Sequence, residues 1–160
     1  IQFETPVETV LYALDLCAEH NIPIIVNPAP AKSIPNEYWL KATYITPNES
    51  EAELLFDMDS ISADLDRKLI ITKGEYGVSY HDAGERKLIP ANKVTPVDTT
   101  GAVDTFNGAL SVALAEGNPL AEALIFANAA SALSIQKFGA QAGMPTREEV
   151  EAFLSNNPSF

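Results

Sequence analysis

A chain of 160 residues can bury a substantial core, and one domain is the expected number. Its 22 acidic residues outnumber its 10 basic ones, for a formal net charge of −12, so nucleic acids and anionic membranes are poor partners. The single cysteine, Cys17, has no possible intrachain disulfide partner, and no apolar run approaches the roughly 20 residues of a membrane span. These features favour a cytoplasmic protein.

The first half of the sequence predicts helices that alternate with short buried strands. A helix is expected over residues 7–18, with Thr5 as cap, Pro6 in the first turn and Glu8 closing a capping box. The apolar run 22–26 predicts a buried strand. A short helix, a strand, a turn leading into a helix, and another buried strand follow at 36–42, 43–46, 47–56 and 69–72.

The second half predicts a hairpin followed by helices. Residues 77–81 and 87–90 form the expected strand pair, joined through the turn sequence "DAGE". Two helices follow from Thr105 to residue 134, then a loop over 137–145 and a last helix with a capping box from Thr146 to Glu149. Strands alternating with helices predict an α/β fold with a largely parallel sheet flanked by helices, whose ligands bind in strand-to-helix loops.

The segment 98–104, "DTTGAVD", predicts an anion site at the start of a helix. The peptide N–H groups of residues 101–104 have no partner within such a helix and lie at the positive end of its dipole. Asp104 in that position suits a base that accepts a proton from a hydroxyl group beside a bound phosphate. The alternative is that Asp98 and Asp104 are only helix caps.

Two further loops carry weaker patterns of the same kind. In "TPNESEAE", Asn48 and Glu51 are one helical turn apart and could reach Mg²⁺ through water, although a solvated acidic first turn has the same pattern. In "TKGEYG", Gly74 and Gly77 allow a close approach of backbone to an anionic or flat ligand, although the entry to a hairpin needs the same freedom. No Walker A or G-x-G-x-x-G motif occurs.

Taken together, these motifs resemble ribokinase and its relatives, the PfkB-type carbohydrate kinases. The segment "DTTGAVDTFNGAL" is similar to the family signature D-T-x-G-A-G-D-T-F-N-G-A, and "NPAP", "TPNESEAE", "ITKGEYG" and "NAASALSIQKFGAQAGMP" occur in the family's order. The resemblance implies a ribokinase-like fold and transfer of the γ-phosphoryl group of ATP to a hydroxyl group of a small sugar, with ribose favoured. ATP and Mg²⁺ are the implied cofactors.

The resemblance also implies a role for each matching residue. Asp104 would be the catalytic base, and the backbone of Gly101, Ala102, Val103 and Asp104 would be the anion hole. The nucleotide and its Mg²⁺ would be held by Asn48, Glu51, Thr72, Gly74, Gly77 and Asn128, the last of which matches an adenine contact. A monovalent cation, normally K⁺, would be bound by Asp98, Thr100 and the carbonyl groups of Ser134, Lys137 and Gly139.

The sequence departs from the family pattern in two ways. Val103 stands where the family has glycine, and a branched side chain beside the phosphate site predicts low activity. The family's N-terminal sugar-binding and lid portion has no counterpart, so residues 1–160 are expected to be the nucleotide-binding and catalytic portion, which self-associates or pairs with the missing half. Two alternatives stay open: a catalytically impaired nucleotide-binding fragment, and an interaction fragment that binds no nucleotide.

Overall fold

The structure, a computed structural model, describes residues 1–157, which divide into two compact units. The first unit comprises Ile1–Gly74 and Val78–Leu88, and the second comprises Glu75–Gly77 and the chain from Ile89 onward. The structure thus contains two compact units, whereas the sequence suggested one domain. That the whole chain acts as one nucleotide-binding and catalytic portion stays a prediction.

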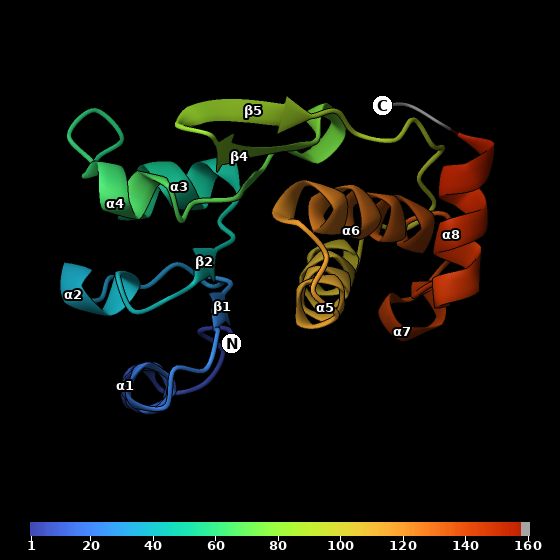
Figure 1. Ribbon diagram of the computed structural model, residues 1–160. Coiled ribbons are helices and arrows are strands. Elements are labelled where there is room, and N and C mark those ends of the chain that lie inside the picture. The colour runs from blue at the N-terminus through green and yellow to red at the C-terminus, as the bar shows by residue number, and fades with distance from the viewer. Residues whose placement is uncertain (158–160) are drawn as a thin grey trace. The chain divides into compact units, whose positions relative to one another are not determined.

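The first unit contains short helices and a parallel strand pair (Figure 1). Its helices are α1 (Val7–Glu19), α2 (Asn36–Trp39), α3 (Glu49–Leu55) and α4 (Ala63–Asp66). Strands β1 (Ile25–Val26) and β2 (Tyr44–Ile45) pair in parallel, with Ile25 opposite Tyr44. Isolated parallel bridges extend this pairing from Gln2 to Asn27, from Ile45 to Leu69 and from Asn48 to Thr72. The predicted α/β class with parallel pairing is confirmed.

An antiparallel sheet follows the parallel strands in the chain. Strands β3 (Ile71–Thr72), β4 (Val78–Asp82) and β5 (Glu85–Ile89) are neighbours in that order, and β3 pairs antiparallel with β4. A 3₁₀ turn, η1 (Gly74–Tyr76), connects β3 to β4. The hairpin predicted through "DAGE" is therefore present; β4 begins one residue later than predicted, and β5 begins two residues earlier.

Aromatic side chains form the centre of the first unit's core. Trp39 is 1% exposed and makes edge-to-face contacts with Phe3 and Phe56, at centroid distances of 5.6 Å and 5.2 Å. Such geometry places the positive ring edge against the negative ring face and adds to the hydrophobic gain of burial. Trp39 thus serves packing.

The second unit is helical over most of its length. It contains α5 (Ala102–Ala115), α6 (Leu120–Ser134), α7 (Ala140–Gly143) and α8 (Arg147–Asn156). Helix α6 packs along α5 and against α8, burying small residues such as Ala129 and Ala130 together with Val150 (Figure 1). Within residues 1–157, no helix has the length and apolar character needed to cross a membrane.

Three local predictions were wrong. The first helix begins at Val7 after an extended Pro6 at the N-cap position, and no side chain caps it, so Thr5 and Glu8 form no capping box. The strand predicted from residue 22 begins at Ile25, and Ile22 is 53% exposed. The predicted loop 137–145 contains the short helix α7. The capping box of α8, from Thr146 to Glu149, is confirmed.

Candidate functional site

The first turn of α5 presents the predicted anion-binding backbone. Gly101 is the N-cap residue with φ of +80°, and Ala102, Val103 and Asp104 are the first three helical residues. The N–H groups of such residues have no partner within the helix and lie at the positive end of its dipole, although Ala102 N–H also donates to Thr99 O at 3.2 Å. Asp104 is exposed in this turn. The arrangement can hold an anion next to a carboxylate.

Gly101 is required by this geometry for two separate reasons. Its positive φ lies in the left-handed region that favours glycine, and a Cβ built on it would lie 2.9 Å from the Cβ of Ala140 in α7. The close contact means that the start of α5 is fixed against α7. The conformation of the first turn of α5 thus depends on Gly101, a glycine that also belongs to the family signature.

Gly101→Ala is expected to destabilise the protein by about 2–5 kcal/mol, since the left-handed conformation costs about 1–2 kcal/mol and overpacking about 1–3 kcal/mol. Gly117→Ala is the matched control, because Gly117 has φ of +86° but no atom lies within 4 Å of the place that its Cβ would take. Urea unfolding of both variants measures the difference. Equal losses of stability would contradict a role for the contact with Ala140.

Val103 lies in the first turn of α5 without distorting the helix. It lies in regular helix, its side chain is 42% exposed, and its carbonyl oxygen accepts a hydrogen bond from Asn107 Nδ2 at 2.9 Å. The backbone therefore tolerates valine at this position. What distinguishes it from glycine is a branched side chain beside the N–H groups that would contact an anion.

The Asp98 carboxylate ties the loop before α5 to the loop before α7. Its Oδ1 accepts the N–H of Thr100 at 3.0 Å, and its Oδ2 accepts the N–H of Gly139 at 2.9 Å. The pKa of Asp98 is lowered mainly by the Thr100 N–H, then by the Thr100 hydroxyl and the Gly139 N–H, because these donors stabilise the ionised form. Three of the predicted cation-site residues are thus in direct contact.

Acid is expected to weaken this tie. Because folding lowers the pKa of Asp98 below its unfolded value of about 3.9, its stabilisation is fully present above that value and is lost as the pH falls through the lower, folded pKa. Asp98→Asn should therefore be less stable than the parent near neutral pH, and the difference should shrink in acid. Urea unfolding at about pH 7 and about pH 3 tests this; a difference that stays constant would contradict it.

The carbonyl groups of Ser134 and Lys137 both face Gly143 in α7. A Cβ on Gly143 would lie 2.5 Å from Ser134 O and 3.7 Å from Lys137 O, so the lack of a side chain leaves room around these oxygens. Ser134 Oγ donates to Ser131 O at 2.8 Å, and Ser131 Oγ donates to Ala102 O at 3.0 Å. The end of α6 is thereby hydrogen-bonded, step by step, to the first turn of α5.

In the first unit, Asn48 and Glu51 form a capping box at the start of α3. Asn48 Oδ1 accepts the N–H of Glu51 at 2.8 Å, and Glu51 Oε2 accepts the N–H of Asn48 at 2.9 Å. One carboxylate oxygen of Glu51 remains for water or a cation. Both side chains are exposed or half-exposed, and the helix dipole favours a carboxylate here. The solvated acidic first turn, which was the alternative interpretation of this motif, is therefore present. If these residues also bind Mg²⁺, they would do so through water molecules.

Thr72 lies next to this capping box. Its N–H donates to Pro47 O at 2.9 Å, its hydroxyl donates to the same oxygen at 3.4 Å, and Lys73 Nζ lies 3.0 Å from Glu49 Oε1. Gly74 follows at the start of η1, and no atom lies within 4 Å of the place that a Cβ on it would take. The loops after β2 and β3 are thus held side by side, as carboxyl ends of parallel strands are.

Gly77 and Asn128, both in the second unit, contact the segment 89–91. A Cβ on Gly77 would lie 2.0 Å from Ile89 O and 2.7 Å from Ala91 N, so no other residue fits there. Asn128 Nδ2 donates to Pro90 O at 2.8 Å. The amide group of Asn128 thus positions backbone, and its carbonyl oxygen remains for a ligand. Its predicted adenine contact stays a prediction.

The cation ligands that these residues offer are oxygen atoms. Within residues 1–157, no three His, Cys, Asp or Glu side chains converge as a metal cluster. The Asp98 loop and the open space at Gly143 offer a carboxylate and backbone carbonyl oxygens, which are hard oxygen ligands. Mg²⁺ would need phosphate oxygens and water beside Glu51, as it does where nucleotides are bound.

Sequence reasoning missed two contributors to this site, Gly143 and Ser131. The contact of Gly143 with Ser134 O depends on the position of α7, which the sequence pattern did not predict. Ser131 lies in an alanine-rich helix, where a serine has no distinguishing pattern, and its bond to Ala102 spans 29 residues of sequence. The only local signal was the break in helical pattern around "GAQAG".

Comparison with known proteins identifies the family. The profile of the pfkB family carbohydrate kinases matches residues 1–147. The chain therefore belongs to the pfkB family of carbohydrate kinases. Among its relatives are ribokinases: that of Bacillus subtilis is 54% identical over an aligned length of 158 residues that covers 97% of this chain, and that of Lactococcus lactis is 45% identical over 96% of this chain.

Solved ribokinase structures share the fold. The ribokinase of Thermotoga maritima is 41% identical and superimposes with a TM-score of 0.82 over 97% of this chain. The ribokinase of Arabidopsis thaliana, complexed with ribose and ATP, is 28% identical with a TM-score of 0.84 over 96% of this chain. The chain spans about half the length of these relatives, 54% of the Bacillus subtilis protein and 55% of the Thermotoga maritima chain. The predicted ribokinase-like fold is confirmed.

Proposed function

We propose that this chain is the nucleotide-binding and catalytic portion of an ATP-dependent sugar kinase, with ribose as the substrate. The observation that carries the proposal is the first turn of α5, where a glycine N-cap, backbone N–H groups at the positive end of the helix dipole and the carboxylate of Asp104 occur together within a pfkB signature. Phosphoryl transfer needs an anion site and a base close to each other, and these groups supply both.

In the proposed reaction, Asp104 accepts the proton of a sugar hydroxyl group. The oxygen of that hydroxyl group then attacks the γ-phosphorus of ATP, the bond from that phosphorus to the bridging oxygen breaks, and ADP leaves. The N–H groups of Gly101, Val103 and their neighbours stabilise the charge on the transferring phosphoryl group. Glu51 and Asn48 would hold Mg²⁺ through water, and the bound ion would neutralise phosphate charge.

In this proposal, the nucleotide binds to the segments around Gly74 and Gly77 and to α6. Thr72 and Gly74 present backbone to the phosphates, Gly77 lets the chain pass close to residues 89–91, and Asn128 offers its free carbonyl oxygen to adenine. Asp98 and Thr100, with carbonyl groups of Ser134, Lys137 and Gly139, would hold K⁺. Support comes from relatives: one ribokinase structure contains ribose and ATP, and another contains ADP.

A catalytically impaired nucleotide-binding protein is the second candidate, and Val103 favours it. A side chain that is 42% exposed at the second residue of α5 takes up space where phosphate oxygens approach the backbone. In-line transfer tolerates little misplacement, since a shift of about 1 Å can cost about 10²-fold in rate. This candidate keeps ATP binding and loses turnover. In either case, the sugar-binding half of the relatives is the proposed partner.

The test uses a chimera in which this chain replaces the matching half of the Bacillus subtilis ribokinase. We expect ATP-, ribose- and K⁺-dependent phosphorylation, together with a higher melting temperature of the 160-residue chain in excess ATP and Mg²⁺, since ligand binding to the native state raises stability. A stabilised but inactive chimera would favour the nucleotide-binding protein. Absence of both effects would reject the nucleotide assignment.

A further inference from the structure

A serine in the middle of α6 bonds differently from two serines elsewhere in the helices. Ser111 and Ser155 each donate to the carbonyl oxygen four residues earlier in their own helix, at 2.7 Å and 2.8 Å. This is the local bond that serines inside helices commonly form. Ser131 instead donates to the carbonyl oxygen of Ala102 in α5, at 3.0 Å. Its hydroxyl group thus reaches the helix that carries the proposed anion site.

The carbonyl group that accepts this bond belongs to the first helical residue of α5. The same peptide unit carries the N–H group of Val103, the second helical residue. Because this N–H group lies in the first turn, the helix itself supplies no partner for it. Ser131 therefore contacts, on its oxygen side, a peptide whose N–H group is proposed to hold phosphate.

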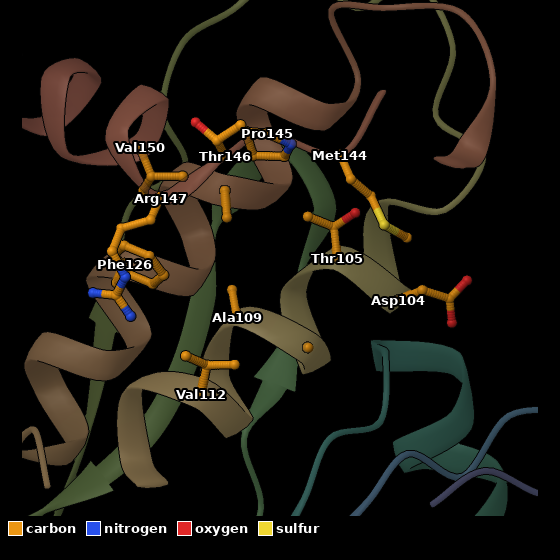
Figure 2. Close-up of a pocket in the computed structure, with 12 residues that line it drawn as sticks. Asp104, Thr105, Ala109, Val112, Phe126, Met144, Pro145, Thr146, Arg147 and Val150 are labelled. Carbon is orange, nitrogen blue, oxygen red and sulfur yellow. The ribbon is translucent and has the colours of Figure 1, made fainter. Parts of the chain in front are cut away.

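The first turn of α5 is buried on one side and open on the other. Thr105 is 7% exposed, whereas Asp104 is exposed and projects outward from the turn (Figure 2). Ser131 is half-buried and stands between Ala130 and Ala132, which are both buried. Alanine is the better helix former, so helix formation gives no reason for a serine here. What the serine adds is the hydroxyl group bonded to α5.

A hydrogen bond to a carbonyl oxygen strengthens the N–H group of the same peptide as a donor. The bond draws electron density toward the oxygen, and such chains of hydrogen bonds strengthen one another by about 10–30% per bond. The peptide unit is also planar, so fixing its oxygen restricts the direction of its N–H group. Ser131 can thus prepare Val103 N–H for an anion before the anion binds, which is how electrostatic stabilisation works best.

We propose that Ser131 is a positioning residue of the anion site, whose hydroxyl group orients and polarises the peptide between Ala102 and Val103 for a phosphate group. The inference rests on the proposed function, because it takes the first turn of α5 as the phosphate site. It adds a residue from a different helix, which acts only through the Ala102 carbonyl group.

The test measures phosphate binding and the peptide itself by NMR, with the 160-residue chain labelled with ¹³C and ¹⁵N. Inorganic phosphate is titrated at constant ionic strength, with sodium chloride as the reference salt. In the parent protein, we expect phosphate to shift the amide signal of Val103 and chloride to leave it in place. Ser131→Ala should bind phosphate about 2- to 5-fold more weakly, because it loses the polarisation of one donor.

A second measurement, made without phosphate, separates this role from a purely structural one. Loss of the hydrogen bond should move the carbonyl ¹³C signal of Ala102 and the ¹⁵N signal of Val103 upfield, because both atoms belong to the peptide that is no longer polarised. A bond that only joins the two helices would lower the melting temperature without this paired change. Ser131→Thr keeps the hydroxyl group and should restore both signals and the affinity.

Ser111→Ala is the matched control, because it removes a bond from a hydroxyl group to a carbonyl group of α5 beyond the first turn. It should leave both measurements unchanged. A parent protein that binds no phosphate, or that responds equally to chloride, would reject the anion site of the proposed function and this inference with it. If the parent binds phosphate, the role of Ser131 alone is overturned by an equal affinity of Ser131→Ala, by unchanged peptide signals, or by Ser131→Thr behaving like Ser131→Ala.

Discussion

Replacing Asp104 by asparagine is expected to lower the rate of ribose phosphorylation by the chimera about 10²- to 10⁴-fold, which is the usual contribution of a positioned general base. Asparagine has nearly the same shape but cannot accept the proton of the sugar hydroxyl group. Because Asp104 lies in the first turn of α5 and its proposed role is in the chemical step, kcat should fall while the melting-temperature shift caused by ATP and Mg²⁺ persists.

The chain offers a matched control for this variant. Glu122 is the third residue of α6, as Asp104 is the third residue of α5, so each is a carboxylate in the first turn of a helix. Glu122→Gln removes a similar interaction with the helix dipole without touching the proposed site. We expect it to keep full activity. A chimera with Asp104→Asn that works as fast as the Glu122→Gln variant would remove Asp104 from the reaction.

Replacing Val103 by glycine is expected to raise turnover by about 10- to 100-fold. The backbone at Val103 is already helical, so the substitution removes side-chain bulk and leaves the N–H groups where they are. Glycine in a helix costs stability, by about 0.5 kcal/mol relative to valine, and the gain should appear despite that loss. Steady-state kinetics of the chimera with ATP and ribose measure it.

Ala115→Gly is the control for the effect of glycine on helix stability, since Ala115 is the exposed last residue of the same helix. It should lower stability without raising activity. If Val103→Gly and the parent chimera turn over equally fast, valine is compatible with phosphate binding in this protein. If both are inactive while ATP still raises the melting temperature, the nucleotide-binding protein without turnover becomes the better description.

Local parts of the site could be predicted because their geometry depends on neighbouring residues alone. Asp104 stands three residues after Gly101, so a helix starting there places its carboxylate beside the N–H groups of the first turn. The capping box of Asn48 and Glu51 likewise spans a single turn. In both cases the chemistry was readable from spacing, although spacing could not decide between cap and ligand.

Contacts between distant segments could not be predicted in this way. The bond from Gly139 N–H to Asp98 spans 41 residues of sequence, and α7 has four residues, too few to produce a helical pattern. The cap of α1 was misplaced by one residue, at Thr5, because Pro6 adopts an extended ψ of 139° and takes the cap position itself. The predicted strand began too early, at residue 22, because an apolar run in the sequence does not show that the Ile22 side chain is exposed.

The hydroxyl relay from Ser134 through Ser131 to Ala102 has a thermodynamic consequence. It joins a carbonyl-bearing helix end to the turn that would receive a phosphate, so the two ends can share strain. Coupling free energy is symmetric. If a cation bound at the end of α6 raises the affinity of the α5 turn for phosphate by some factor, bound phosphate raises the affinity for the cation by the same factor. Cutting this link at Ser131 should therefore reduce the coupling between the two ends, while the bond from Gly139 N–H to Asp98 and the close contact of Gly101 with Ala140 would still join them.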